Sequence, residues 1–153
     1  MAIKTRGFFY IQQVEQLVNQ CLEEVLAPHG MTAGQYLVMS LVTHHEPLSS
    51  AELSRFARKT AQSTGEFVKA LEYKGWLERR DDENNRRVLR ISTTPKGRAV
   101  MKRCEVAVDE AERIFFSCLL PDELSNLRQA LNRMRNAAYE RQLVGIEGTR
   151  NFV

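Results

Sequence analysis

Apolar residues recur along this chain at the two spacings that mark helices and strands. Between Phe8 and Pro28 they fall three or four positions apart, which gathers them into one stripe on an α-helix. Thr32 and Gln35 have the spacing of an N-terminal capping box. The helix that follows, from residue 33 to about 44, is apolar nearly all round, which predicts a buried central position.

Two shorter helices are expected after a break at Pro47. Ser49 and Glu52 again have capping-box spacing, and Thr60 is placed to cap a helix that runs to about Lys74. The first of these helices is expected to turn inward Leu53, Phe56 and Ala57. The second is expected to bury Phe67, Val68, Ala70 and Leu71.

Residues 76–97 predict a β-hairpin with a charged tip. Gly75 suits the left-handed end of the preceding helix, and Leu89 and Ile91 fall two positions apart, which is the period of a half-buried strand. Residues 81–87, between the two strands, are all polar or charged. Because a lone hairpin is only marginally stable, this one must pack against the helices.

Two long helices are expected to follow the hairpin. Thr94 and Pro95 form a typical helix start, and the helix should run from Lys96 to about Cys118. A last helix begins near Pro121 and carries a narrow, coiled-coil-like seam of Leu124, Leu127, Leu131, Met134 and Ala138. Residues 144–153 show no periodicity and are expected to form a tail.

Positive charge is concentrated in the middle of the chain. The 153 residues have a net charge of +3, but residues 55–103 carry 14 Lys and Arg against 6 Asp and Glu, a local net charge of +8. This distribution indicates a surface that faces a polyanion. The longest apolar runs are too short to cross a bilayer, so we expect a cytoplasmic protein with no membrane partner.

Two short helices followed by a basic hairpin predict a winged helix-turn-helix. The expected fold is mainly α with a small β-hairpin wing, flanked by long N- and C-terminal dimerisation helices. Over about residues 8–142 the chain contains four characteristic segments, at 30–35, 49–53, 71–79 and 82–97. In these segments it resembles the MarR family of transcriptional regulators. Asn85 departs from the family pattern, because an aspartate usually stands there and orients an arginine.

Binding to double-stranded DNA follows from the resemblance and from the chemistry of the residues. Side chains at the start of the 60–74 helix offer donors and acceptors to base edges in a major groove, and wing arginines suit a narrow minor groove. Phosphate contacts are expected from Arg58, Lys59 and Arg80. The full expected set is Arg58, Lys59, Thr60, Gln62, Ser63, Thr64, Lys69, Arg80, Arg86 and Arg87. The alternative for the wing is a solvated charged turn that pairs these arginines with Asp81, Asp82 and Glu83.

The first helix and the last two carry apolar stripes longer than so small a module can bury. We predict that residues 1–30 and 96–143 form a dimerisation region around a DNA-binding domain at 31–95. An intrachain helical bundle is the alternative. A two-fold homodimer implies a palindromic or pseudo-palindromic operator with half-sites about one DNA turn apart.

The resemblance also implies a small-molecule effector, because MarR-like proteins often bind aromatic or phenolic compounds between the dimer helices and the winged unit. Effector binding would release a repressor from its operator. The candidate lining residues are Phe8, Phe9, Tyr10, Tyr36, Met39 and Phe115. The alternative is that these side chains are simply core, which is what apolar residues at helical spacing usually are.

Other chemistries have less support. Cys21, Cys104 and Cys118 form no C-x-x-C pair, which favours reduced thiols, although a redox-responsive regulator of the same fold is an alternative. The long helix after the hairpin has no histidine, so we expect no metal and no cofactor. A protein-interaction module would not require the basic patch. An enzyme would require a nucleophile–base pair or paired carboxylates, and no motif supplies them.

Overall fold

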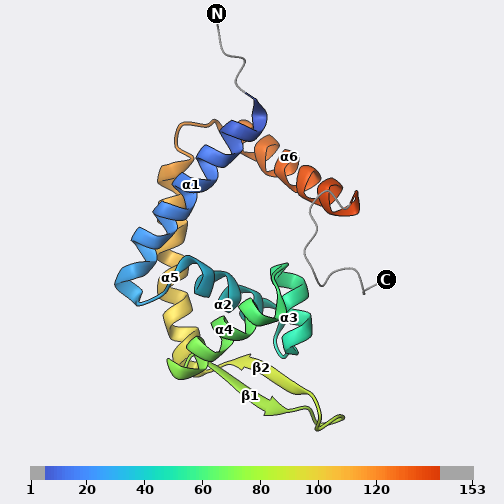
Figure 1. Ribbon diagram of the computed structural model, residues 1–153. Helices are drawn as coiled ribbons and strands as arrows, with labels where there is room; N and C mark the ends of the chain where they lie inside the picture. Colours follow the sequence, from blue (N-terminus) through green and yellow to red (C-terminus); the bar gives the residue numbers. More distant parts are fainter. Residues whose placement is uncertain (1–5, 142–153) are drawn as a thin grey trace, which may run out of the picture.

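The computed structural model describes residues 6–141 (Figure 1). In this range the fold is mainly helical with a two-stranded hairpin, and the elements follow in the predicted order, so the predicted fold class is confirmed. None of the described helices is long and apolar enough to cross a membrane. The elements are α1 (Gly7–Leu26), the 3-10 turn η1 (Ala27–His29), α2 (Ala33–His45), α3 (Ser50–Ala57), α4 (Ala61–Tyr73), β1 (Leu77–Asp81), β2 (Leu89–Thr93), α5 (Pro95–Phe115) and α6 (Pro121–Glu140).

Both predicted capping boxes are formed. The Thr32 hydroxyl accepts a hydrogen bond from the backbone N–H of Gln35, whose side chain accepts one from the backbone of Thr32. Ser49 and Glu52 make the same reciprocal pair at the start of α3. Each box satisfies backbone donors that a helix leaves unpaired at its first turn. The starts of α2 and α3 are therefore determined locally.

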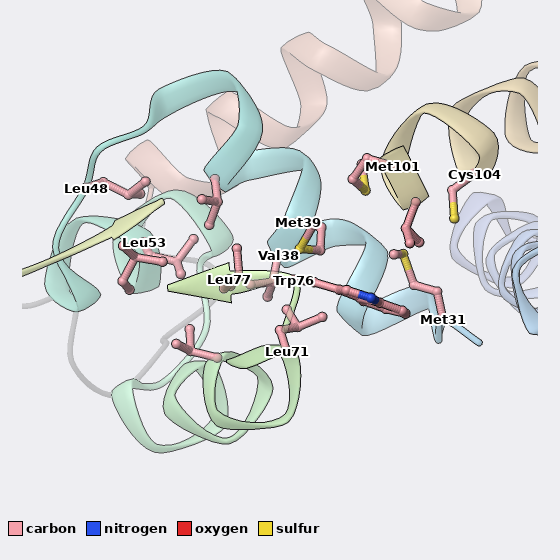
Figure 2. Packing of buried hydrophobic residues seen from close by; sticks show 14 of the residues in the cluster. Met31, Val38, Met39, Leu48, Leu53, Leu71, Trp76, Leu77, Met101 and Cys104 are labelled. Carbon is pink, nitrogen blue, oxygen red and sulfur yellow. The ribbon is translucent and has the colours of Figure 1, made fainter. Parts of the chain in front are cut away.

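The core lies where α2, α4, the hairpin and the start of α5 meet. Trp76 and Leu77, at the entry to β1, point between α2 and α4 alongside Met39 and Leu71 (Figure 2). Gly97, in the first turn of α5, is packed directly on the backbone of Trp76, because a Cβ atom at Gly97 would lie 2.1 Å from the Trp76 carbonyl oxygen. This close approach joins α5 to the base of the hairpin.

The hairpin has one buried end and one exposed end. β1 pairs with β2 in antiparallel register from Leu77–Thr93 to Asp81–Leu89, and Leu48 forms a further bridge to Ile91. Ile91 and Thr93 are buried. Leu89, at the end of β2 nearer the hairpin tip, is 44% exposed because this part of the hairpin extends past the core. The alternation predicted for a half-buried strand is therefore present at Ile91, whereas Leu89 is more exposed than the pattern suggested.

Phe56 also differs from its prediction. It is 44% exposed at the end of α3 instead of facing the core. Its ring stacks on the ring of His45, at the end of α2, with a centroid distance of 4.4 Å, so one face of the Phe56 ring is covered. Leu53 alone anchors α3 in the core.

A hydrogen-bonded cluster connects the end of α2, strand β2 and α5. The Glu46 carboxylate accepts hydrogen bonds from the backbone N–H of Thr93 (2.6 Å) and from its hydroxyl (2.8 Å). The Arg98 guanidinium donates to the Thr93 carbonyl oxygen at 2.7 Å. Because Thr93 is buried, water cannot reach its polar groups, and these bonds supply their hydrogen-bond partners. The root of the hairpin and the first turn of α5 are thus held together.

The flanking helices are only partly covered by the rest of the chain. α1 packs on α5, whereas α6 turns back from the far end of α5 toward α3 (Figure 1). No residue of α6 is buried, and Leu131 and Met134 of its seam are 45% and 49% exposed. At the start of α1, Phe8 is 85% exposed. These apolar stripes are not buried within the described chain.

Candidate nucleic-acid interface

The turn between α3 and α4 presents a helix N-terminus with two cations beside it. Arg58 ends α3 in the left-handed conformation (φ 51°), and Thr60 then caps α4 by accepting a hydrogen bond from the backbone N–H of Ser63 at 3.1 Å. Backbone N–H groups at such a terminus favour a phosphate. The Arg58 guanidinium carbon lies 3.5 Å from the ring centroid of Tyr139, so α6 reaches this turn. Lys59 is partly buried beside Phe67.

The outer face of α4 carries only some of the predicted readers. Gln62 and Lys69 are exposed, and Ser63 is partly exposed. Thr64 is 1% exposed, and its hydroxyl has no hydrogen-bond partner among the described residues. It falls on the same helical face as Val68 and Leu71, which point into the core. The prediction of a DNA contact by Thr64 was therefore wrong.

The wing tip presents two unpaired arginines. Arg86 and Arg87 are exposed, and neither side chain makes a hydrogen bond or ion pair within residues 6–141. Asn85 shapes the tip, because its side-chain oxygen accepts from the backbone N–H of Arg87 (3.1 Å) and its carbonyl accepts from that of Val88 (2.8 Å). Asn85 therefore orders the turn through hydrogen bonds rather than by charge.

The carboxylate that anchors the wing is Asp82. One Asp82 oxygen accepts from the backbone N–H groups of Asn84 (2.8 Å) and Asn85 (3.0 Å), and the other accepts from the guanidinium of Arg90. Arg90 also contacts the Glu52 carboxylate at 2.9 Å, which links the wing to the start of α3. Sequence reasoning missed this Asp82–Arg90–Glu52 cluster. Because Asp82 binds Arg90 and the wing backbone, the alternative in which Asp82 pairs with the tip arginines does not hold.

Hydrogen bonding keeps both acids of this cluster ionised. The hydrogen bond from Arg90, followed by those from the wing backbone, lowers the pKa of Asp82 below its ordinary value. The backbone and side-chain hydrogen bonds of Ser49, with a smaller contribution from Arg90, lower the pKa of Glu52. Both pKa shifts favour the charged form of the carboxylates that bind Arg90.

Arg80 lies on the hairpin away from the tip. Its side chain is 76% exposed and forms an ion pair with Glu78 at 2.8 Å. An exposed pair of this kind contributes little to stability, so the guanidinium remains available to a phosphate. The α3–α4 turn, α4 and the wing lie next to one another (Figure 1), and together with the basic side chains described above we call them the basic unit.

The six candidate ligand residues are not brought together. Met39 is fully buried in the core, whereas Phe8, Phe9 and Tyr10 are 85%, 52% and 57% exposed at the start of α1. Tyr36 is partly buried, and burial, with nearby acidic residues such as Glu105, raises its pKa. Only Phe115 lines the cavity of about 250 Å³ between α1 and α5. The other lining residues are Val18, Cys21, Leu22, Val108, Ala111, Glu112 and Phe116.

The remaining reactive groups are dispersed. Cys21 is partly buried, Cys104 is buried and Cys118 is exposed, and all three are free thiols. Burial raises the pKa of the Cys104 thiol, which disfavours the reactive thiolate. Within the described ranges, no three His, Cys, Asp or Glu side chains gather to hold a metal ion.

A helix-turn-helix that continues into an anchored basic hairpin defines a winged helix-turn-helix protein. Residues 31–89, which span most of this unit, match the sequence profile of the MarR family. The winged helix-turn-helix unit of this chain therefore matches the MarR family, and solved MarR structures share the fold of the chain.

Known relatives match nearly the full described chain. The HTH-type transcriptional repressor Rv2887 of Mycobacterium tuberculosis is 25% identical over 82% of this chain and 91% of its own length. The crystal structure of a MarR variant from Escherichia coli complexed with operator DNA has a TM-score of 0.77 at 25% identity, and covers 82% of this chain and 90% of that one. CouR from Rhodococcus jostii, bound to p-coumaroyl-CoA, has the same fold, with a TM-score of 0.79 at 21% identity over 88% of this chain and 94% of its own.

Proposed function

We propose that the protein is a cytoplasmic, homodimeric transcriptional repressor that binds a pseudo-palindromic operator and is released from it by a small aromatic or phenolic ligand. The observation that carries the proposal is the wing, where Arg86 and Arg87 have no internal partner while Asp82 and Arg90 anchor its root. Exposed, unpaired arginines on an anchored hairpin are suited to contact a phosphate backbone or a minor groove. The operator-bound MarR structure supports DNA as the partner, and the name of the mycobacterial relative supports repression.

The dimer is supported by the exposed stripes of α1 and α6. Apolar side chains at coiled-coil spacing, such as Leu131 and Met134, are stabilised when a second copy buries them. We assign dimerisation to residues 1–30 and 96–143 and DNA binding to 31–95; residues 1–5, 142–143 and the 144–153 tail lie outside the described residues. In a two-fold dimer the two α4 helices would read half-sites about one DNA turn apart.

Selection from a random duplex library tests DNA binding directly. The protein is expected to enrich a two-fold symmetric sequence with half-site centres about 10 base pairs apart. Affinity for the enriched duplex should fall steeply with salt, with a logarithmic slope of about 0.9 for each phosphate neutralised. A protein-interaction module would enrich no sequence, and a flat salt response would contradict the electrostatic role of the basic unit.

The effector site is assigned to the cavity between α1 and α5. Its walls are apolar except for Glu112 and the Cys21 thiol, and a volume of about 250 Å³ accommodates a single aromatic ring. The aromatic acyl group bound by CouR supports this ligand class. The cavity lies between two helices of the dimerisation region. A ligand there would change the orientation of α5, and with it the position of the winged unit.

A thermal-shift screen tests the effector assignment. Aromatic acids and phenols that bind the folded protein are expected to raise its melting temperature, because they bind the native state alone. Ala111→Phe should fill the cavity and abolish the shift. Val106→Phe is the matched control, since Val106 is on α5 but 68% exposed and outside the cavity. A ligand shift that survives Ala111→Phe would place the effector elsewhere.

A further inference from the structure

The outer face of α4 contains a carboxylate that the DNA-binding proposal leaves unexplained. Gln62, Glu66, Lys69 and Tyr73 are all exposed and follow one another at steps of four, three and four residues. At 100° per residue these steps keep all four side chains within one narrow stripe. The stripe lies opposite the buried face formed by Thr64, Val68 and Leu71. Glu66 is therefore at the centre of the surface that would face a DNA groove.

Nothing in the described structure gives Glu66 an internal role. The Glu66 carboxylate makes no hydrogen bond or ion pair within residues 6–141. By contrast, the Glu52 carboxylate accepts from the backbone N–H of Ser49 at the start of α3, and Glu72 pairs with Arg79 at 3.0 Å. The adjacent Gly65 has no atom within 4 Å of the position a Cβ would take. A glycine inside a helix costs about 1 kcal/mol relative to alanine, and here it leaves the backbone beside Glu66 open to close approach.

A carboxylate in this position is unfavourable for general DNA binding, because the phosphates on either side of the groove repel it. It becomes favourable only if it accepts a hydrogen bond from a base edge. In the major groove guanine offers two acceptors, thymine offers an acceptor and a methyl group, and adenine places an acceptor beside its amino group. Cytosine offers its N4 amino donor with no acceptor of its own beside it. A carboxylate on the reading helix therefore matches cytosine best.

We propose that Glu66 is a specificity-determining residue that selects a cytosine in each half-site of the operator by accepting a hydrogen bond from its N4 amino group. This inference rests on the proposed function. It gives the recognition helix one negative reader between two other polar side chains, Gln62 and Lys69. The negative charge also weakens binding to DNA that lacks the cytosine, so it raises the ratio of specific to non-specific affinity.

The test is selection from a random duplex library with the full-length protein and its Glu66→Ala and Glu66→Gln variants. The unmodified protein should prefer cytosine at one position of each half-site by about fivefold to a hundredfold. Glu66→Ala should lose that preference while the rest of the enriched sequence remains. Glu66→Gln should shift the same position toward adenine, because a glutamine side chain pairs with the adenine N6 and N7 groups.

Glu83→Gln is the matched control, because it removes the same charge from an exposed position near the wing tip but off α4. It should leave the base preference unchanged. Retention of the cytosine preference by Glu66→Ala would overturn the assignment and leave the DNA-binding function intact. A uniform rise in affinity for all duplexes would also overturn it, since Glu66 would then only repel phosphates. If the unmodified protein enriches no sequence, the proposed function fails, and the assignment fails with it.

Discussion

Replacing both Arg86 and Arg87 with alanine is expected to reduce operator affinity by about a hundredfold or more, while the protein stays folded. Each arginine contact to DNA contributes about 1–3 kcal/mol, and two are removed from each subunit of the dimer. The fold should persist because neither side chain has an internal partner, and the Asp82–Arg90–Glu52 cluster that holds the wing is untouched. The measurement is a titration of labelled operator at several salt concentrations, together with a thermal melt.

The salt dependence separates direct contact from a general loss of charge. The slope of log affinity against log salt should fall by about four, because the dimer loses two phosphate-neutralising groups from each of its subunits. Lys102→Ala with Arg103→Ala removes the same charge from an exposed part of α5 and should change affinity far less. If this control weakens binding as much as the wing variant, the effect reflects net charge and the wing assignment is wrong.

The largest loss of stability is expected from Gly97→Ala. The added Cβ would lie 2.1 Å from the Trp76 carbonyl oxygen and 2.9 Å from its carbonyl carbon, and these backbone atoms cannot rotate away as a side chain would. The same oxygen accepts a hydrogen bond from the backbone N–H of Thr94 at 3.0 Å, so a shift of the chain would also break the helix start. Overpacking of this kind costs about 1–3 kcal/mol or more. At this chain length that corresponds to a fall in melting temperature of about 3–10 °C.

Gly65→Ala is the matched control for this substitution. It makes the same chemical change inside a helix where no atom lies within 4 Å of the new Cβ, so it should raise stability by about 0.5–1 kcal/mol. Chemical denaturation of both variants would measure the change in the free energy of unfolding, which should be negative for Gly97→Ala and positive for Gly65→Ala. Equal effects of the two substitutions would show that helix propensity, not the contact with Trp76, determines the result.

Local chemistry explains which parts of the fold could be predicted. The capping boxes at Thr32 and Ser49 and the left-handed Gly75 depend on residues at most three positions apart, and sequence spacing contains that information. Thr64 could also have been recognised as buried, because it falls four residues before Val68 and seven before Leu71. The hydroxyl of Thr64 suggested a DNA contact, but its position on the helix places the side chain on the buried face.

Long-range partners could not be predicted in this way. Arg90 pairs with Glu52 across 38 positions, and Glu46 binds Thr93 across 47. Several acidic residues compete for each arginine in this basic region, and only the packing of the hairpin against α3 selects among them. The six proposed ligand residues do not lie together for a related reason, since an apolar side chain such as Met39 is more typical of a core than of a ligand site from sequence alone.

The bonds of Glu46 and Arg98 to Thr93 make α5 a lever arm for the wing. The 21 residues of α5 span about 32 Å at 1.5 Å per residue. A tilt of about 10° at its far end, where Phe115 lines the cavity, would therefore displace the Thr93 end by roughly 5 Å if the helix pivots as a rigid rod. A minor groove is only about 6 Å wide. A shift too small to disturb the core could thus move the wing tip out of register with the duplex.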